Sequence, residues 1–541
     1  MEAHLKTSLL NASALSFALA IGLAPAIAPA VHAQDQRPRR PQAESGAEPR
    51  TGGNNAAPAD DSSTPIPPET KSETKHDWTV GPRVVHYTAT AGNLLIKDDA
   101  GKANGSIFYV AYTEDGVPAK SRPVTFLYNG GPGSATIWLH MGSVGPIRVV
   151  TSSPEASGPP PYERVQNQYS LIDKTDLVFV DAPMTGFSRA VGKGTAKDFA
   201  GVDEDVRAFN KFITRYITVN DRWNSPKFLF GESYGTPRSA ALVASLNNDG
   251  IAFNGVTLLS SILNYFQEAP GYDIESPTYL PSYAAIAWQH NKVPHTGTMP
   301  EFVDKARKFA GGPYAAALAQ GDRLSAADFD ATAKQIAAFT GLSVGYIKEA
   351  KLRISPTRFR KELLRSDDKI MGRYDARFLG YDVDSAGDNP GFDPSDTGIS
   401  GVYVASFHDY LSTDLKFQTS EPYLLHANFG GAQWNWNHRP SGGGGRGGFG
   451  GQVQPDTVVD LSDAMRKNPR LKVFSANGWF DLATPFFGTE HDLAQMMLPA
   501  SLQSNVQFGY YPAGHMVYLN VEALKAMHAD LERFYGEATT K

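Results

Sequence analysis

The sequence predicts an α/β protein built on a mostly parallel β-sheet with helices on both faces. Short runs of consecutive apolar residues, each long enough for one buried strand, recur along the chain, and segments with the apolar spacing of helices separate them. The chain has 541 residues, of which 41% are hydrophobic and 20% charged. This length and composition suit one large α/β domain that carries insertions.

The predicted strands fall into two groups. Residues 84–89 and 106–112 are rich in β-branched and aromatic residues and are bounded by glycine and Asp-Gly turns, so we expect an antiparallel pair at one edge of the sheet. Residues 198–219 have the spacing of an amphipathic helix between two of the later strands. The buried strands are expected at 124–128, 176–180, 228–230, 256–259, 471–475 and 506–510.

A long interval, about 264–455, interrupts this alternation. It contains amphipathic helical patterns such as 325–339 and 344–353, together with aromatic-rich segments. An insertion between the later strands of such a sheet is expected to form a helical cap over the functional site and to shape its pocket.

The N-terminal region predicts export. Residues 1–33 have a positive Lys6, an apolar, alanine-rich stretch and small residues at Val31-His32-Ala33, as a cleaved signal peptide does. Residues 34–75 are rich in proline, glycine, small and acidic residues, which predicts a disordered linker before a folded domain at 76–541. The mature protein is expected in the periplasm or outside the cell, without a membrane span. The chain has no cysteine, so it has no thiol nucleophile.

The stretch Gly231-Glu232-Ser233-Tyr234-Gly235 reads G-x-S-x-G between an apolar strand and a helical segment. In that context the pattern is a nucleophile elbow, because the glycines allow a sharp bend that projects the serine hydroxyl above the sheet. Strand, elbow and helix together predict the α/β-hydrolase fold, with Ser233 as nucleophile.

A serine hydroxyl needs a general base, and the base needs a carboxylate to fix its tautomer. In this fold the order along the chain is serine, acid, histidine. Asp481 follows the strand at 471–475, and His515 follows the strand at 506–510. Since catalytic groups gather at the carboxyl ends of parallel strands, we expect a triad of Ser233, Asp481 and His515.

An oxyanion hole requires two N–H donors aimed at the developing negative charge. One is expected from the backbone of Tyr234, directly after the nucleophile. The other is expected from the glycine loop 129–134, which reads Asn-Gly-Gly-Pro-Gly-Ser and follows the strand 124–128.

Four motifs in order resemble those of the serine carboxypeptidases. They are the glycine loop 129–134, the segment from Val180 to Ser188, the Gly-Glu-Ser-Tyr-Gly elbow and Gly514-His515-Met516. The resemblance extends from about Trp78 onward and implies an exported, bacterial-type serine exopeptidase that removes the C-terminal residue of peptides through an acyl-enzyme on Ser233.

The resemblance also assigns roles to single residues. It implies that the N–H groups of Gly131 and Tyr234 form the oxyanion hole, and that Asn129, Gly130 and Glu232 bind the terminal carboxylate of the substrate. This chain departs from the best-known members, which have a second glutamate just before a Gly-Pro pair. Here Ser143-Val144 stands in that place.

Other readings of the sequence remain open. An esterase or acyltransferase could use the same scaffold, and a non-catalytic exported binding protein could retain it. No metal or cofactor is expected, because this chemistry needs none. The net charge of −6 and the lack of long basic runs argue against a nucleic-acid partner. Peptides with a free C-terminus are the expected substrates, and the sequence leaves the oligomeric state undetermined.

Overall fold

The computed structural model describes residues 63–268, 271–440 and 451–540. They belong to a compact unit that spans Ser62–Lys541. The predicted signal peptide and most of the predicted linker lie outside the described residues. No helix among the described residues is long and apolar enough to cross a membrane.

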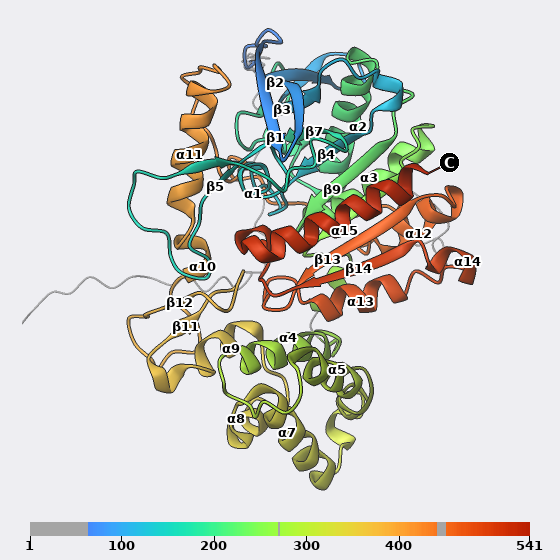
Figure 1. Cartoon of the computed structure of the whole chain (residues 1–541). Coiled ribbons are helices and arrows are strands. Elements are labelled where there is room, and N and C mark those ends of the chain that lie inside the picture. Colours follow the sequence, from blue (N-terminus) through green and yellow to red (C-terminus); the bar gives the residue numbers. More distant parts are fainter. Residues whose placement is uncertain (1–62, 269–270, 441–450, 541) are drawn as a thin grey trace, which may run out of the picture. The chain divides into compact units, whose positions relative to one another are not determined.

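A ten-stranded sheet is the centre of this unit, with strand order β1-β2-β3-β7-β4-β9-β10-β13-β14 and β8 paired with β3 (Figure 1). The pairings from β7 to β14 are parallel, whereas β1, β2, β3 and β7 pair antiparallel. This confirms the predicted α/β-hydrolase fold and its antiparallel edge. The strand bounds are β1 Lys71–Val80, β2 Arg83–Lys97, β3 Ala103–Glu114, β4 Val124–Tyr128, β7 Asp176–Val180, β8 Arg189–Ala190, β9 Lys227–Glu232, β10 Gly255–Leu259, β13 Lys472–Gly478 and β14 Val506–Tyr511.

Helices cover both faces of the sheet, as the uninterrupted apolar strands require. Side chains of α2, α3 and α12 share one hydrophobic core with the sheet, and those of α1, α11 and α15 share another. Figure 1 shows α15 lying over the sheet, roughly in line with β13 and β14. The bounds are α1 Ile137–Gly142, α2 Val202–Val219, α3 Gly235–Asn248, α11 Ser400–Thr413, α12 Val458–Lys467 and α15 Val521–Thr539.

The N-terminal boundary of the fold differs from the prediction. Residues 71–75, expected at the end of the disordered linker, form the first half of β1 and pair with β2, with Lys71 opposite Gly92. The side chains of Lys71, Glu73 and Lys75 are exposed, so the strand is held by its backbone and its composition resembles that of a linker. Helix α2 also starts later than predicted, because residues 196–198 form a separate 3₁₀ turn.

The long interval lies between two strands that are neighbours in the sheet. Strands β10 and β13 pair in parallel, with Gly255 opposite Lys472. The inserted helices have a hydrophobic core of their own, which includes Tyr283, Val303 and Phe359. The remaining helices with bounds in this insertion are α4 Glu275–Gln289, α5 Met299–Phe309, α6 Ala315–Leu318, α7 Ala326–Thr340, α8 Val344–Glu349, α9 Pro356–Glu362 and α10 Pro394–Thr397.

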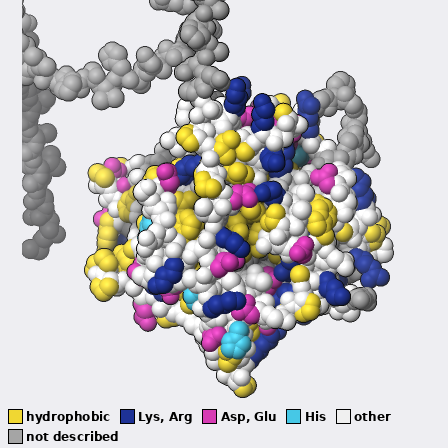
Figure 2. All heavy atoms as spheres, turned by 90° about the horizontal axis from the view of Figure 1, so that it is seen from above, with side chains coloured by type: hydrophobic (Ala, Val, Ile, Leu, Met, Phe, Trp, Pro, Cys, Tyr) yellow, Lys and Arg dark blue, Asp and Glu magenta, His cyan; other side chains and the backbone are white. Residues whose placement is uncertain are grey.

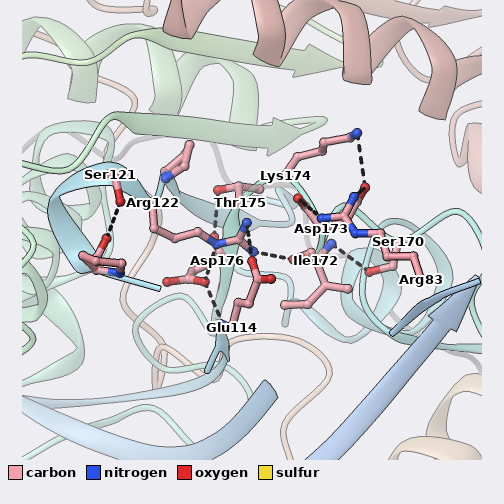
Figure 3. A network of polar contacts seen from close by, with 12 residues as sticks. Arg83, Glu114, Ser121, Arg122, Ser170, Ile172, Asp173, Lys174, Thr175 and Asp176 are labelled. Atoms are coloured by element: carbon pink, nitrogen blue, oxygen red, sulfur yellow. Dashed lines mark hydrogen bonds and ion pairs between the residues drawn. The ribbon is translucent and has the colours of Figure 1, made fainter. Parts of the chain in front are cut away.

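A network of ion pairs joins the ends of the central strands away from the elbow. The guanidinium of Arg122 lies between Asp176, with Nε 3.0 Å from Oδ1, and Glu114, with a nitrogen 2.8 Å from Oε2 (Figure 3). Arg222 reaches the other oxygen of Asp176. Since Arg122, Asp176 and Arg222 are all buried, losing one partner would leave an uncompensated charge.

One face of the molecule carries charges of both signs. On the face shown in Figure 2, Lys and Arg side chains are interspersed with Asp, Glu and hydrophobic ones. This mixture agrees with the small net charge of the sequence.

Candidate active site

Ser233 stands at a sharp turn between β9 and α3. Its φ of +59° lies in the left-handed region that residues with a side chain rarely adopt. The turn brings backbone so close that a Cβ at Gly231 would lie 2.1 Å from the carbonyl oxygen of Gly235. The N–H of Ser233 donates to Leu259 in the neighbouring strand β10, with an N–O distance of 3.0 Å. The local geometry is that of the predicted nucleophile elbow.

Asp481 and His515 come together from the ends of β13 and β14. Nδ1 of His515 is 2.7 Å from Oδ2 of Asp481, and both side chains are buried. Asp481 also accepts hydrogen bonds from the N–H groups of Ala483 and Thr484 and from the Thr484 hydroxyl, at 2.7, 3.1 and 2.8 Å. The carboxylate is therefore fixed in the orientation that holds a proton on Nδ1 and leaves Nε2 available as a base.

The electrostatics around His515 favour its charged form. Burial lowers the pKa of His515, but the Asp481 carboxylate outweighs that effect and the pKa is raised overall, with a further contribution from Glu232. The raised pKa means that the imidazolium, which forms when the histidine takes a proton, is stabilised.

The glycine loop packs directly against the elbow. A Cβ at Gly130 would lie 2.3 Å from the backbone nitrogen of Tyr234, so only glycine allows this approach. Gly131 has φ +108°. Among the described residues, neither the N–H of Gly131 nor that of Tyr234 donates to an acceptor within the protein. Both donors are thus left for a ligand.

A buried ion pair supports the loop from below. Arg238 of α3 donates to the backbone oxygen of Asn129 at 2.7 Å and to the Asp205 carboxylate of α2 at 2.6 Å. The Asn129 side chain accepts from the N–H of Leu139 in α1 at 2.9 Å. The loop is therefore tied to three helices that flank the sheet.

Glu232 points into a buried environment beside the nucleophile. Its Oε2 accepts a hydrogen bond from the Tyr518 hydroxyl at 2.9 Å. Burial raises the pKa of Glu232 to about 7, although His515, the Tyr518 hydroxyl and Asn129 oppose the rise. This carboxyl group therefore changes its protonation state near neutral pH.

One cavity of about 630 Å³ brings the predicted site residues together. Ser233, His515, Glu232, Asn129, Gly130 and Gly131 all line it. Asp481 lies behind His515, and the Tyr234 ring is buried below the elbow against Trp434. The insertion supplies much of the opposite wall through Tyr265, Arg373, Tyr374, Asp396, His426 and Trp436.

The wall at Trp436 is anchored by a buried histidine. His438 contacts Asp203 of α2 through Nδ1 at 2.7 Å and Asp460 of α12 through Nε2 at 2.8 Å. Burial lowers the pKa of His438, but the two carboxylates outweigh it and raise the pKa to about 9. His438 is therefore charged at neutral pH, with both ring nitrogens donating.

Sequence reasoning did not find several of these residues. Thr484, which contacts both Asp481 and His515, could have been noticed as a hydroxyl three positions after the acid in a strand-end loop. Tyr518, Arg373 and His438 have no local signal, because their partners are distant along the chain.

Residues 83–291 match the family described as serine carboxypeptidase. Over 141 residues the chain is 29% identical to serine-type carboxypeptidase F of Aspergillus niger. This matched region covers 26% of this chain and 24% of that protein. Over 155 residues it is 30% identical to the pheromone-processing carboxypeptidase KEX1 of Cryptococcus gattii, which covers 28% of this chain and 22% of that protein. The chain thus spans about a quarter of the length of these curated relatives.

Among solved structures, the chain is similar to the prohormone-processing carboxypeptidase KEX1 of Saccharomyces cerevisiae. The identity is 14%, the match covers 83% of this chain and 92% of that one, and the TM-score is 0.49. The family match contains the glycine loop and the elbow, whereas Asp481 and His515 lie beyond it. The match of residues 83–291 to the serine carboxypeptidase family agrees with the resemblance that the sequence motifs predicted.

Proposed function

We propose that this protein is a serine-type carboxypeptidase that hydrolyses the last peptide bond of peptides with a free C-terminus. The observation that carries the proposal is the single cavity that Ser233, His515, Glu232 and the glycine loop all line. The proposal is supported because a candidate nucleophile, a candidate base and a buried carboxyl group line one cavity of about 630 Å³.

In the proposed reaction, Oγ of Ser233 attacks the carbonyl carbon of the last peptide bond while Nε2 of His515 takes the hydroxyl proton. The N–H groups of Gly131 and Tyr234 stabilise the tetrahedral oxyanion. When the C–N bond breaks, His515 returns the proton to the amine of the leaving amino acid. A water molecule then attacks the acyl-serine with His515 as base. The ester C–O bond breaks, His515 returns the proton to Oγ of Ser233, and the shortened peptide leaves.

Glu232, with Asn129 and Gly130, is proposed to bind the terminal carboxylate of the peptide. Two carboxylates repel each other unless they share a proton, so binding requires protonated Glu232. Because the pKa of Glu232 is about 7, KM for peptides should be low below pH 7 and should rise above it. Catalysis instead requires neutral His515, so the rate optimum is a compromise between the two groups.

Two measurements test the activity. The protein should react with a fluorophosphonate probe, and Ser233→Ala should abolish the labelling. A blocked dipeptide with a free carboxylate should be cleaved far faster than its C-terminal amide. Faster cleavage of a simple ester than of the dipeptide would favour an esterase. Transfer of the acyl group to an added amine in preference to water would favour an acyltransferase. Absence of labelling in the wild-type protein would favour a binding protein.

The pH argument has its own test. Glu232→Gln replaces the titrating carboxyl group with a neutral one of nearly the same shape. KM for the free-acid dipeptide should then lose its rise above neutral pH. If the pH dependence of KM is unchanged in this variant, Glu232 does not bind the terminal carboxylate.

The N-terminal region is proposed to direct export, with residues 1–33 as a cleaved signal peptide. Expression of the full chain in a bacterial host should yield a mature protein that begins at Gln34. N-terminal sequencing of the periplasmic and culture-medium fractions would show the cleavage site and the destination. Recovery of the uncleaved chain from the cytoplasm would contradict the proposal.

A further inference from the structure

Glu232 lines the cavity, and its carboxyl group contacts a tyrosine that does not line it. Tyr518 lies in the short 3₁₀ turn Val517–Leu519 that follows His515, and its ring is buried. Its hydroxyl is 2.9 Å from Oε2 and 3.2 Å from Oε1 of Glu232. Glu232 lines the cavity, whereas Tyr518 is not among the residues that line it. Tyr518 therefore acts on a ligand indirectly, through Glu232 and through Asn129, which also forms a side-chain hydrogen bond with Tyr518.

A glycine at the end of α1 makes room for this contact. A Cβ at Gly142 would lie 2.3 Å from the hydroxyl of Tyr403 and 2.5 Å from a ring carbon of Tyr518. The two tyrosines thus lie together beside α1, and the charge of Glu232 contributes to raising the pKa of both. Only one of them donates to it: the buried Tyr403 hydroxyl has no hydrogen-bond partner among the described residues.

We propose that Tyr518 is a positioning residue for carboxylate recognition, holding the Glu232 carboxyl group toward the cavity and favouring its ionised form. The proposal rests on the proposed function and deepens it. According to the proposal, Tyr518 sets the highest pH at which the enzyme still binds the free carboxylate of a peptide.

The direction of the effect follows from the groups around Glu232. Burial raises the pKa of this carboxyl group, His515 and the Tyr518 hydroxyl lower it, and the Asp481 charge adds a small rise. A tyrosine hydroxyl can donate to a carboxylate, so it stabilises the ionised form. Without that donor, Glu232 should stay protonated to higher pH, and the rise of KM should move in the alkaline direction.

The test compares Tyr518→Phe with the wild type and with Tyr403→Phe as a matched control. Both substitutions remove one buried hydroxyl from the same cluster, but only the first removes a hydrogen bond to Glu232. KM and kcat are measured for a blocked dipeptide and for its amide between about pH 5 and pH 9. Titration of active sites with a fluorophosphonate corrects for any misfolded fraction.

In Tyr518→Phe, the rise of KM for the free acid should shift by about one pH unit in the alkaline direction, whereas the amide should show no such shift. Tyr403→Phe should leave the rise in place. An unmoved rise in Tyr518→Phe, or an equal change for acid and amide, would overturn the proposal.

A readout without substrate separates this proposal from the proposed function. Infrared titration should show a protonated carboxyl band that Glu232→Gln removes, with a midpoint that is higher in Tyr518→Phe than in the wild type. If the wild-type enzyme does not distinguish acid from amide, the carboxypeptidase function fails and recognition fails with it. The infrared titration then still tests the effect of Tyr518 on Glu232. If the wild type and Tyr518→Phe have the same midpoint, Tyr518 does not affect the protonation of Glu232.

Discussion

Removing the charge of His438 should make the stability of the protein less sensitive to alkaline pH. His438 lies between Asp203 and Asp460, which raise its pKa from the ordinary value near 6.5 to about 9. A group whose pKa is raised by folding adds stability that is complete below the unfolded pKa and is lost as pH rises through the folded one. At 1.36 kcal/mol per pKa unit, the contribution is about 3 kcal/mol below about pH 6.5, and it disappears above about pH 9.

The perturbation is His438→Gln, which keeps a polar side chain of similar length but no titrating charge. The free energy of unfolding is measured by urea denaturation at about pH 6 and about pH 10. The wild type should be more stable than the variant by about 3 kcal/mol at the lower pH, and the difference should shrink at the higher one. His408→Gln, an exposed histidine of α11, is the matched control and should show no such trend. A difference that is the same at both pH values would refute the reasoning.

Three further substitutions test the site and its support. Asp481→Asn should lower kcat by about three to four orders of magnitude with little change in KM, because the tautomer of the base is lost; steady-state kinetics that show a loss in KM instead would contradict the role. Gly130→Ala should lower kcat by more than about 100-fold, because its Cβ would meet the backbone nitrogen of Tyr234 at 2.3 Å; wild-type rates of fluorophosphonate labelling would argue against an oxyanion hole there. Arg238→Met should destabilise the fold by about 3–5 kcal/mol, because it leaves buried Asp205 unpaired; a melting temperature equal to that of the wild type would show that the pair is dispensable.

The sequence predicted the central fold well because its signals are local. Strands such as β4 and β7 are apolar throughout and buried at every position, so their bounds could be predicted without homologues. The same rule placed Asp481 and His515, since parallel strands direct their following loops to one edge of the sheet. Their 2.7 Å contact therefore follows from topology.

What could not be predicted depends on partners distant in sequence. Strand β1 is polar on its exposed positions and exists because β2 supplies a backbone ladder, which composition does not reveal. The sequence around Tyr518 does not indicate that its hydroxyl contacts Glu232 in the folded protein. The sequence around His438 likewise does not indicate that its ring lies between two carboxylates from α2 and α12. In each case the tertiary contact, not the residue type, defines the role.

The position of the long insertion has a consequence for synthesis on the ribosome. Strands β9 and β10 emerge first, and roughly 200 residues pass before β13 arrives to pair with β10. During that time the edge of β10 has no partner, and an unpaired apolar strand is a template for aggregation. The insertion has its own core around Tyr283 and Phe359, so it can fold before β13 is synthesised and pairs with β10. Early folding of these helices would shorten the effective loop that β13 must close, and would thereby speed completion of the sheet.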